Sequence, residues 1–584
     1  MKTLEYKNIY QELPPNLTES DTVSLDLELS GLRDTQLHRP FGRFLSLAGS
    51  FDGENAFIVF GDDQVQEFMS RVDKATQVFH NSVFDLGHLK RWTEIAERKN
   101  MRDTLLIERL LWSNYYSDFT LADLVRRYLR CYMEKATRKE FHDLEGEMTW
   151  KQIEYSALDV IGTWLVDKEQ QKIISGVDKK IWTNLYNPHV YTTLELGGFT
   201  VDVEKWKAIT LENQSVVSEI EADLGQKYGW METKTVGRGK NKTEVQNFVP
   251  FNPASPMQVL KICKSMGLDV ESTGDDVISP HYESNEFVKK ILDYRKANKQ
   301  VTTYGLDFLD YVEEDGRIYT SLNIGLATTG RDSSSSPNLQ NIPTRTKHRE
   351  CFIAGKGKKL ILYDYSGQEA NIFAYLTQDP KLIEIINSGK KLYLEIAKEA
   401  FNEILTKESP RYKVIKALVL GLMYGLSVRG FARDNDVDED TAQVMFDMFF
   451  ETYPVAHQYY KNMISQNRGV SKSILGRTAH LHPYDWQWRT HSLNNPMQMS
   501  AGDMIKGAMK KFRRTEFYKK YYPTKQVCLI LQVHDEIIAE ADEHLAEECA
   551  SVLKKCMIET AEMIHPGIVG NVSGGIIENW SQKD

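Results

Sequence analysis

The sequence predicts a multidomain protein built from α/β and α+β units, and three observations lead to that expectation. A chain of 584 residues is too long for one hydrophobic core and implies several domains. Residues 22–60 contain three strand-like runs, and helical patterns follow from about 64 to 165, as in an α/β unit. Further along, strand-like runs that begin near 318 and at 527 enclose a mostly helical stretch over 381–466, which indicates an α+β arrangement.

The bulk composition is that of a folded protein of a reducing compartment. Hydrophobic residues make up 41% of the chain and aromatic residues 11%, which is typical of a globular protein rather than a disordered one. Apolar runs stay shorter than the roughly 18 residues a membrane helix needs, and Met1–Glu5 contains no apolar signal core. The six cysteines are scattered without a C-x-x-C pair. We therefore expect a cytoplasmic protein that does not contact membranes.

The distribution of charge favours a phosphate-backbone partner, although the net charge of −10 argues against one. The window 505–525 holds eight lysines and arginines against one acid, and the window 345–359 holds six against one. A third basic run, Lys234 to Lys242, lies in a Gly- and Asn-containing loop. Such runs usually form solvated faces. Three of them, in a chain that also contains carboxylates at spacings suited to metal binding, point to a nucleic-acid partner.

Acidic residues occur at informative spacings in the N-terminal 160 residues. Asp26 and Glu28 are i and i+2 on a strand, so both face the same side, where they repel unless a metal binds. Asp85 stands at the start of a helical pattern, and Tyr155 and Asp159 share one helix face. Four acids and a phenol suit two metals, a water nucleophile and a tyrosine that orients it. A lone Y-x-x-x-D means little, but the order D-x-E, N-x-x-x-[FY]-D, Y-x-x-x-D is specific.

These residues make the N-terminal region resemble the DEDDy-type 3′→5′ proofreading exonucleases, which have an RNase H-like fold. The resemblance implies that Asp26, Glu28, Asp85 and Asp159 ligate two Mg²⁺ ions and that Tyr155 positions the water. Gly31-Leu32, just after the first acids, also fits the pattern. Because every member is present, the resemblance implies an active nuclease over residues 1–187.

A second pair of acids lies at the ends of apolar strands near the C-terminus. His534, Asp535 and Glu536 form the turn between strand-like runs at 527–530 and 537–539, and Asp364 directly follows the run Lys359–Tyr363. Charges in such surroundings are costly to desolvate unless a cation meets them. The two aspartates suggest a carboxylate pair that holds two magnesium ions for phosphoryl transfer. For either acid alone, a solvated turn is an equally good interpretation.

Two segments between these acids are consistent with nucleotide and DNA contacts. Residues 329–343 are rich in short donors and amides that suit phosphates and base edges, although a surface loop would look similar. Residues 413–425 predict a helix on which Lys416 and Tyr424, eight apart, lie roughly on one face. They could hold a triphosphate and stack beside a base pair, or belong to a core helix with a snorkelling lysine.

In this order the motifs resemble those of family A DNA polymerases, the bacterial DNA polymerase I and phage-replicase type. Asp364-Tyr365-Ser366 with Glu369 is similar to motif A, residues 416–425 to motif B, and residues 533–536 to motif C. The resemblance implies a right-hand polymerase over 188–584, with a thumb at about 188–315, a palm at about 316–380 and 467–584, and fingers at about 381–466.

The resemblance also implies roles for individual residues. Asp364 and Asp535 would ligate two Mg²⁺ ions with Glu536 in support, and Lys416 would contact the phosphates and protonate the leaving group. The nucleotide-binding set would be Lys416, Tyr424, Glu369, Leu420, Tyr393, Arg411 and Tyr412, with Glu369 as the gate against a ribose 2′-hydroxyl. The DNA-binding set would be Arg331, Asn338, Gln340, Asn341, Arg345, Gln498 and His534.

Several positions depart from the family pattern. Gly367 and Asn371 replace a usual glutamine and arginine, and Leu420 stands where an aromatic residue is typical. Tyr412 stands where the family has a phosphate-binding arginine, and the neighbouring Arg411 could take over that role. Tyr393 stands where the family has a histidine that faces the triphosphate. Because an aliphatic side chain cannot stack on a sugar as an aromatic ring does, we expect unusual discrimination among sugar analogues.

The sequence thus predicts a DNA-dependent DNA polymerase with 3′→5′ proofreading. Because the exonuclease signature starts at residue 26, we expect no separate 5′ nuclease domain and a role in phage or viral DNA replication, in the host cytoplasm. Expected partners are primer-template DNA, dNTPs, and a helicase, primase or processivity factor, with Mn²⁺ able to replace Mg²⁺ and the protein a monomer. The alternatives are a single-subunit RNA polymerase-like enzyme and a non-catalytic primer-template binding protein.

Overall fold

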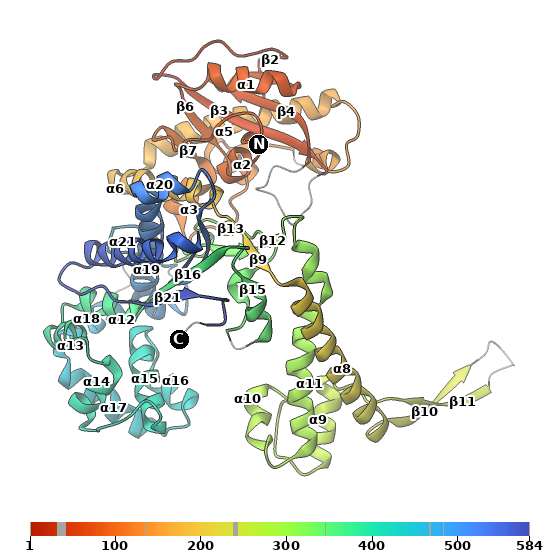
Figure 1. Cartoon of the computed structure of the whole chain (residues 1–584), viewed down its shortest axis with the longest axis vertical. Helices are drawn as coiled ribbons and strands as arrows, with labels where there is room; N and C mark the ends of the chain where they lie inside the picture. The colour runs from red at the N-terminus through yellow and green to blue at the C-terminus, as the bar shows by residue number, and fades with distance from the viewer. Residues whose placement is uncertain are drawn as a thin grey trace.

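The N-terminal unit is a twisted sheet covered by helices. A computed structural model of the chain describes residues 2–31, 42–134, 136–236, 243–344, 346–465, 469–482 and 484–582, without the side chains of 234–236 and 243–245. Six strands pair in the order β2-β5-β4-β3-β6-β7 (Figure 1). They are β2 (Asn8–Tyr10), β5 (Asn55–Val59), β4 (Arg43–Ser50), β3 (Thr22–Ser30), β6 (Thr76–Phe79) and β7 (Met101–Asp103). The helices α1 (Asp62–Arg71), α2 (Ser82–Leu89), α3 (Thr104–Trp112) and α5 (Trp150–Ile173) complete the unit.

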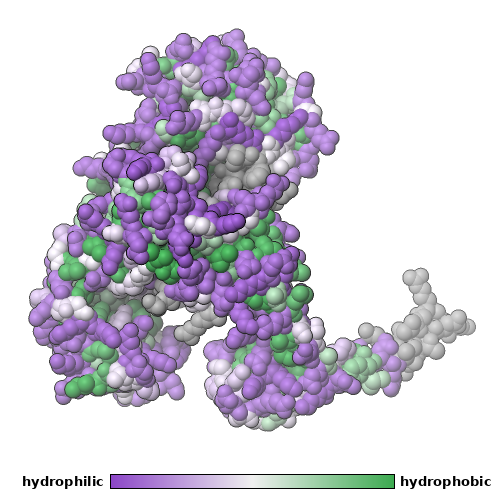
Figure 2. All heavy atoms as spheres, viewed as in Figure 1, coloured by the Kyte–Doolittle hydropathy of each residue, from purple (hydrophilic) through white to green (hydrophobic). Residues whose placement is uncertain are grey.

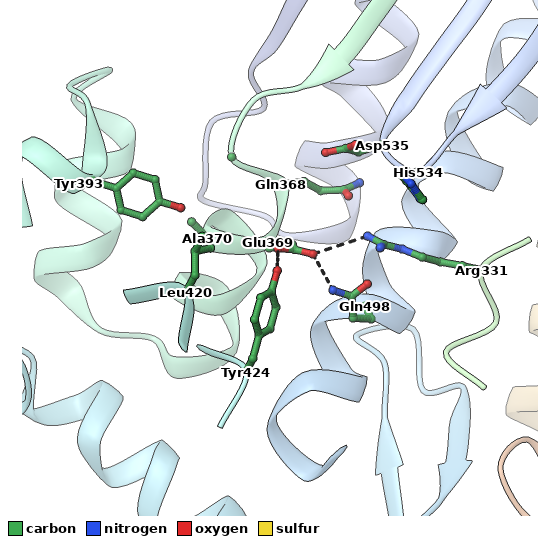
Figure 3. A pocket seen from close by; sticks show the side chains of 11 residues that line it. Arg331, Gln368, Glu369, Ala370, Tyr393, Leu420, Tyr424, Gln498, His534 and Asp535 are labelled. Carbon is green, nitrogen blue, oxygen red and sulfur yellow. Dashed lines mark hydrogen bonds and ion pairs between the residues drawn. The ribbon is translucent and has the colours of Figure 1, made fainter. Parts of the chain in front are cut away.

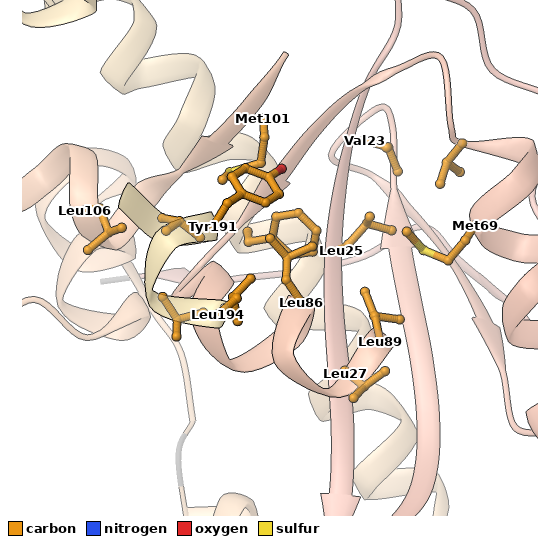
Figure 4. Packing of buried hydrophobic residues seen from close by; sticks show 14 of the residues in the cluster. Val23, Leu25, Leu27, Met69, Leu86, Leu89, Met101, Leu106, Tyr191 and Leu194 are labelled. Carbon is orange, nitrogen blue, oxygen red and sulfur yellow. The ribbon is translucent and has the colours of Figure 1, made fainter. Parts of the chain in front are cut away.

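Alternation along β3 divides apolar from acidic side chains. Val23, Leu25 and Leu27 are buried in one core with residues of α1 and α2, as Figure 4 shows. The intervening Asp26 and Glu28 therefore point to the opposite face, where α5 packs. The expectation of helix throughout 64–165 was wrong at β6 and β7, which pair in parallel with the sheet. At four and three residues these strands are too short to show a period of two.

One continuous helical stretch leads from the N-terminal unit into the rest of the chain. It consists of α6 (Gly176–Ile181), η3 (Trp182–Tyr186) and α7 (Asn187–Leu194). Its apolar residues, among them Trp182 and Tyr191, are buried in the same core as β3, and Ile324 from the following unit joins that core. The boundary expected at 187/188 thus falls inside this stretch, where the lysines of α6 are exposed but the polar residues of α7, among them Asn187 and His189, are buried.

A second sheet carries the C-terminal acids. Its strands pair in the order β19-β20-β16-β21, with bounds β19 (Val527–Val533), β20 (Glu536–Asp542), β16 (Lys358–Tyr365) and β21 (Val572–Ile577). Ile361, Tyr363 and Ile537 pack beneath helices α19 (Trp488–Arg513) and α21 (Ala546–Ile564). Leu360 and Leu362 pack on the other face, around Trp580. Asp364 shares that second face, because side chains alternate along the strand.

Two helical projections flank this sheet (Figure 1). One contains α12 (Gln368–Thr377), α13 (Pro380–Asn387), α14 (Leu392–Phe401), α15 (Pro410–Met423), α16 (Val428–Asp434), α17 (Glu439–Thr452) and α18 (Pro454–Ser465). The other is the pair α8 (Val203–Lys227) and α11 (Glu286–Thr303), with α9 (Pro256–Ser265) and the hairpin β10 (Trp230–Val236) and β11 (Thr243–Val249). Figure 2 shows them as separate lobes. Within the described residues, helices long and apolar enough for a bilayer are absent.

Candidate active sites

A cavity of about 430 Å³ opens where the second sheet meets the α12–α18 projection. Figure 3 shows its lining side chains, which converge from the segment before β14 (Ser333–Ser335), from α12, α14, α15 and α19, and from the β19–β20 turn. Those predicted from the sequence are Arg331, Glu369, Tyr393, Leu420, Tyr424, Gln498, His534 and Asp535. Gly367, Gln368 and Ala370 also line it. The structure therefore brings residues from six separate sequence segments to one place.

The acids at the mouth of this cavity are held by strand pairing. Asp364 lies directly opposite Glu536 in the antiparallel pair of β16 and β20, and the Tyr365 amide donates to the Asp535 carbonyl at 3.2 Å. The β19–β20 turn consists of His534 and Asp535 alone, so His534 adopts a left-handed φ of 55°. This tight turn fixes the Asp535 carboxyl group beside the end of β16.

Glu536 is directed into the protein rather than into the cavity. Its side chain is 1% exposed, its Oε1 accepts a 2.7 Å hydrogen bond from Trp580 Nε1, and Arg349 Nη2 lies 4.0 Å from the same oxygen. The Arg349 guanidinium also covers the Trp580 ring at 4.0 Å. The supporting role of Glu536 is therefore to anchor the turn that carries Asp535.

Glu369 is the centre of a polar network inside the cavity. The Tyr424 hydroxyl donates a short hydrogen bond to Glu369 Oε2, Gln498 Nε2 donates to Oε1 at 2.6 Å, and Arg331 Nη2 lies 3.8 Å from Oε1 (Figure 3). Burial and the bond to Glu369 raise the pKa of the Tyr424 hydroxyl. Because three partners from three segments hold the carboxylate, its position in the cavity is fixed.

The predicted phosphate-binding group lies along α14 and α15. Lys416 Nζ is 5.7 Å from the centre of the Tyr393 ring, and the Tyr393 and Tyr412 rings are 6.4 Å apart. Burial and the charge of Glu369 raise the pKa of Tyr393 to about 12. Arg411 Nε donates to Glu403 Oε1 at 3.1 Å, so that guanidinium is already paired within the fold. Lys416 is exposed beside the cavity, as an incoming phosphate requires.

The donor-rich segment 329–343 is only partly available to a ligand. The Gln340 side chain accepts from the Ser334 amide at 3.1 Å and donates to the Gln532 carbonyl at 3.1 Å. One end of the Gln340 amide thus braces the segment internally, and the other ties it to β19. Asn338 and Asn341 are exposed, and Arg345 lies outside the described residues.

A buried ion network that sequence reasoning missed holds the turn around Arg331. Asp332 Oδ2 is 2.6 Å from His189 Nε2, and its Oδ1 is 2.8 Å from Lys506 Nζ, which also donates to the Gly330 carbonyl at 2.9 Å. Burial alone would raise the pKa of Asp332, but Lys506 and His189 overcome it and hold the pKa well below its usual range. The sequence did offer one signal for this network, because Asp332 is the single acid among the short neutral donors of residues 329–343.

A second site forms in the N-terminal unit. Carboxylate oxygens of Asp26, Glu28 and Asp159 lie within 4.8 Å of one another, between β3 and α5. Asp85 Oδ1 accepts from the Leu27 amide at 3.1 Å, which places this acid beside the other three. The buried Tyr155 is one helical turn before Asp159. The structure thus assembles the predicted set.

The chemistry of this second site fits a divalent cation. Burial raises the pKa of Asp26 to about 6, although the charge of Arg138 opposes the shift. Burial and the charges of Asp26 and Asp159 raise the pKa of Glu28 well above its usual range. A bound cation would offset the repulsion among these crowded carboxyl groups and favour their ionised forms. Within the described part of the chain, no other group of three such ligands is this close.

Comparison with known proteins identifies both units. Residues 226–582 match the family described as DNA polymerase family A, and residues 3–174 match a 3′-5′ exonuclease family. The chain belongs to DNA polymerase family A. The predicted fold, an exonuclease domain followed by a family A polymerase domain, is confirmed.

Named relatives within DNA polymerase family A are bacterial. The chain is 29% identical over 420 residues to "DNA polymerase I, thermostable" of Thermus aquaticus, covering 67% of this chain and 47% of the relative. It is 32% identical over 357 residues to DNA polymerase I of Pseudomonas aeruginosa, covering 57% and 38%. The chain thus spans about half the length of these relatives or less. The fold is similar to that of the POL domain of Pol1 from M. smegmatis, solved with DNA primer-template and dNTP (TM-score 0.80, 22% identity, 99% of this chain and 100% of that one).

Proposed function

We propose that this protein is a DNA-directed DNA polymerase that extends a primer 3′-hydroxyl with dNTPs and proofreads with its 3′→5′ exonuclease. The observation that carries the proposal is the cavity in which Asp535, Glu369, Tyr424 and Gln498 converge beside the end of β16. Membership of DNA polymerase family A supports the same conclusion.

The residues of the cavity account for binding and selection of a nucleotide. Bound between Asp364 and Asp535, two Mg²⁺ ions, or Mn²⁺ in their place, would activate the primer hydroxyl and neutralise the phosphates. Lys416 would attract the triphosphate and protonate the leaving pyrophosphate. Glu369, held in place by Tyr424, Gln498 and Arg331, would reject a ribose 2′-hydroxyl. Leu420 and Tyr393 would cover the sugar and phosphates and exclude water.

The exonuclease site would hold its own pair of divalent ions. Asp26, Glu28, Asp85 and Asp159 provide the carboxylates. Burial and the charge of Asp159 raise the pKa of Tyr155, so its hydroxyl keeps its proton and can donate to an attacking water or to a phosphate oxygen.

We further propose a replicative role in phage or viral DNA synthesis, with a monomeric enzyme in the host cytoplasm that works with a helicase, primase or processivity factor. Support comes from the union of synthesis and proofreading in one chain. Extension of a primer on a long single-stranded template, with and without such factors, tests this role.

Two single substitutions test the assignment of the sites. Asp535→Ala should abolish primer extension with dNTPs and Mg²⁺ and preserve exonuclease activity, and Asp26→Ala should do the reverse. Joint loss of both activities in either variant would contradict two independent sites. Efficient extension with rNTPs by the unmodified protein would favour the RNA polymerase-like alternative, and inactivity in both assays would favour a binding protein.

A further inference from the structure

Aromatic residues occupy every second position between the short strand β18 (Thr478–His480) and α19. His480, His482, Tyr484, Trp486 and Trp488 alternate with other residues, and we call these five side chains the aromatic row. Tyr484 is 90% exposed and Trp486 is 86% exposed, whereas most large apolar side chains of the chain are buried. Exposing two aromatic rings of one short loop to water is unfavourable in free energy, so we expect a ligand to cover them.

The N-terminal end of the row is fastened to the exonuclease unit. The His480 ring stacks on Trp112 at 5.3 Å, its amide donates to the Ser113 carbonyl at 2.9 Å, and Asn114 Nδ2 donates to its carbonyl at 2.7 Å. The exposed Tyr115 lies at the edge of the same ring, 5.2 Å away. The row therefore starts on a rigid support.

The C-terminal end of the row leads to the cavity. A Cβ atom added to Gly425, the residue after Tyr424, would lie 3.1 Å from the Thr490 Cα atom and 3.6 Å from the Arg489 carbonyl oxygen. The first turn of α19 thus packs against the end of the cavity that Tyr424 lines. Gln498 follows Trp488 by ten residues, or about 15 Å of helix. That length corresponds to roughly four stacked nucleotides at about 3.4 Å each.

The charge of the loop suits a nucleic acid. Its one acid, Asp485, is occupied, because Oδ2 is 2.6 Å from His491 Nδ1 and Oδ1 accepts from the Gln487 amide at 2.8 Å. Arg489 is exposed, with its guanidinium 5.5 Å from the centre of the Trp488 ring. Exposed rings beside a cation form a stacking platform for single-stranded DNA, which every base can use.

We propose that the aromatic row binds the unpaired template strand ahead of the cavity, with bases stacked on Tyr484 and Trp486. This inference rests on the proposed polymerase function, because the strand assigned to the aromatic row is the template that the cavity would copy. The template is favoured over an unpaired primer end, since the row leads to the Tyr424 side of the cavity, whereas the exonuclease residues lie on other elements, with Tyr155 and Asp159 on α5 and Asp26 on β3.

Binding of the full chain to primer-templates in EDTA, where neither reaction proceeds, tests this assignment. One fluorescent duplex is given 5′ template overhangs of one or eight nucleotides, and the gain in affinity with overhang length is measured. Tyr484→Ala/Trp486→Ala should reduce that gain by at least about fivefold for each base that loses its stack and leave binding of the one-nucleotide substrate unchanged. Trp486→Phe should retain most of the gain, and so should Tyr132→Ala, which removes a ring that is 56% exposed in the exonuclease unit.

Other outcomes would overturn the proposal. An equal gain in the double variant and the unmodified protein would mean that the rings do not contact the template. Loss of affinity only for a substrate with four unpaired primer nucleotides would assign the row to the primer strand, and a changed oligomeric state would assign it to a second copy of the chain. Failure of the unmodified protein to bind the one-nucleotide substrate would instead contradict the proposed polymerase function.

Discussion

Replacement of Lys506 by methionine tests whether the buried ion network stabilises the turn that carries Arg331. The side chains of Lys506 and Asp332 are both fully buried, with Nζ and Oδ1 2.8 Å apart, and His189 Nε2 is a second polar partner of Asp332. Removal of one partner from a buried pair typically costs about 3–5 kcal/mol. Because His189 remains, we expect a loss of about 3 kcal/mol in the free energy of unfolding of the unit that contains α19.

The pH dependence of this loss has a definite sign. The folded-state pKa of Asp332 lies below its unfolded value, so its stabilising contribution is present above the unfolded pKa and is lost as pH falls through the folded pKa. Without Lys506 the folded pKa rises. The difference between Lys506→Met and the unmodified protein should therefore be largest near neutral pH and shrink in acid.

Urea unfolding followed by circular dichroism measures this effect. Lys511→Met is the matched control, because Lys511 lies on the same helix and pairs at 2.6 Å with Glu559 on the surface. Such a pair is worth about 0–1 kcal/mol. The combination Lys506→Met/Asp332→Leu should recover most of the loss, since it leaves no buried charge without a cation. Equal effects of Lys506→Met and Lys511→Met would refute the reasoning.

Three further predictions concern the cavity and the thumb. Leu420→Tyr should change the ratio of dideoxy- to deoxynucleotide incorporation. Equal ratios in the variant and the unmodified protein would contradict a contact between position 420 and the sugar. Tyr424→Phe removes a hydrogen bond to the Glu369 carboxylate, worth about 1.5–3 kcal/mol. Single-nucleotide kinetics should show roughly tenfold weaker discrimination against rNTPs. An unchanged ratio of dNTP to rNTP incorporation would mean that Gln498 and Arg331 suffice to hold the Glu369 carboxylate in place. Deletion of residues 231–247 should weaken duplex binding and flatten its salt dependence; unchanged affinity would count against DNA contact by this hairpin.

The predictability of the fold depended on the length of each pattern. Long patterns were predicted correctly: the helix expected at 413–425 corresponds to most of α15, and the strands around Asp535 correspond to β19 and β20. The short strands β6 and β7 could not be recognised, because they become strands only by pairing with β3 and with each other. Tertiary pairing decides such segments, and it leaves little trace in local sequence.

For the candidate sites, residue identities were more predictable than side-chain directions. The family resemblance assigned Glu369 and Tyr424 to the nucleotide and Gln498 to the DNA, and the structure joins all three by hydrogen bonds. The inward orientation of Glu536 depends on Trp580, 44 residues further along the chain. The intramolecular use of Gln340 depends on β19 in the same way. Contacts between distant segments of this kind are set by packing and have no local signature.

The helical stretch from Gly176 to Leu194 has a consequence for how the enzyme can be divided. Its side chains complete the core of the exonuclease unit, Tyr186 lies 5.7 Å from Lys506 Nζ, and Ile324 closes the same core from the polymerase side. A fragment that starts at residue 188 would lose the aromatic residues against which the turn before Arg331 is built. Under the proposed function, point substitution could therefore silence proofreading with little effect on synthesis, whereas excision of the whole unit would also damage the polymerase domain.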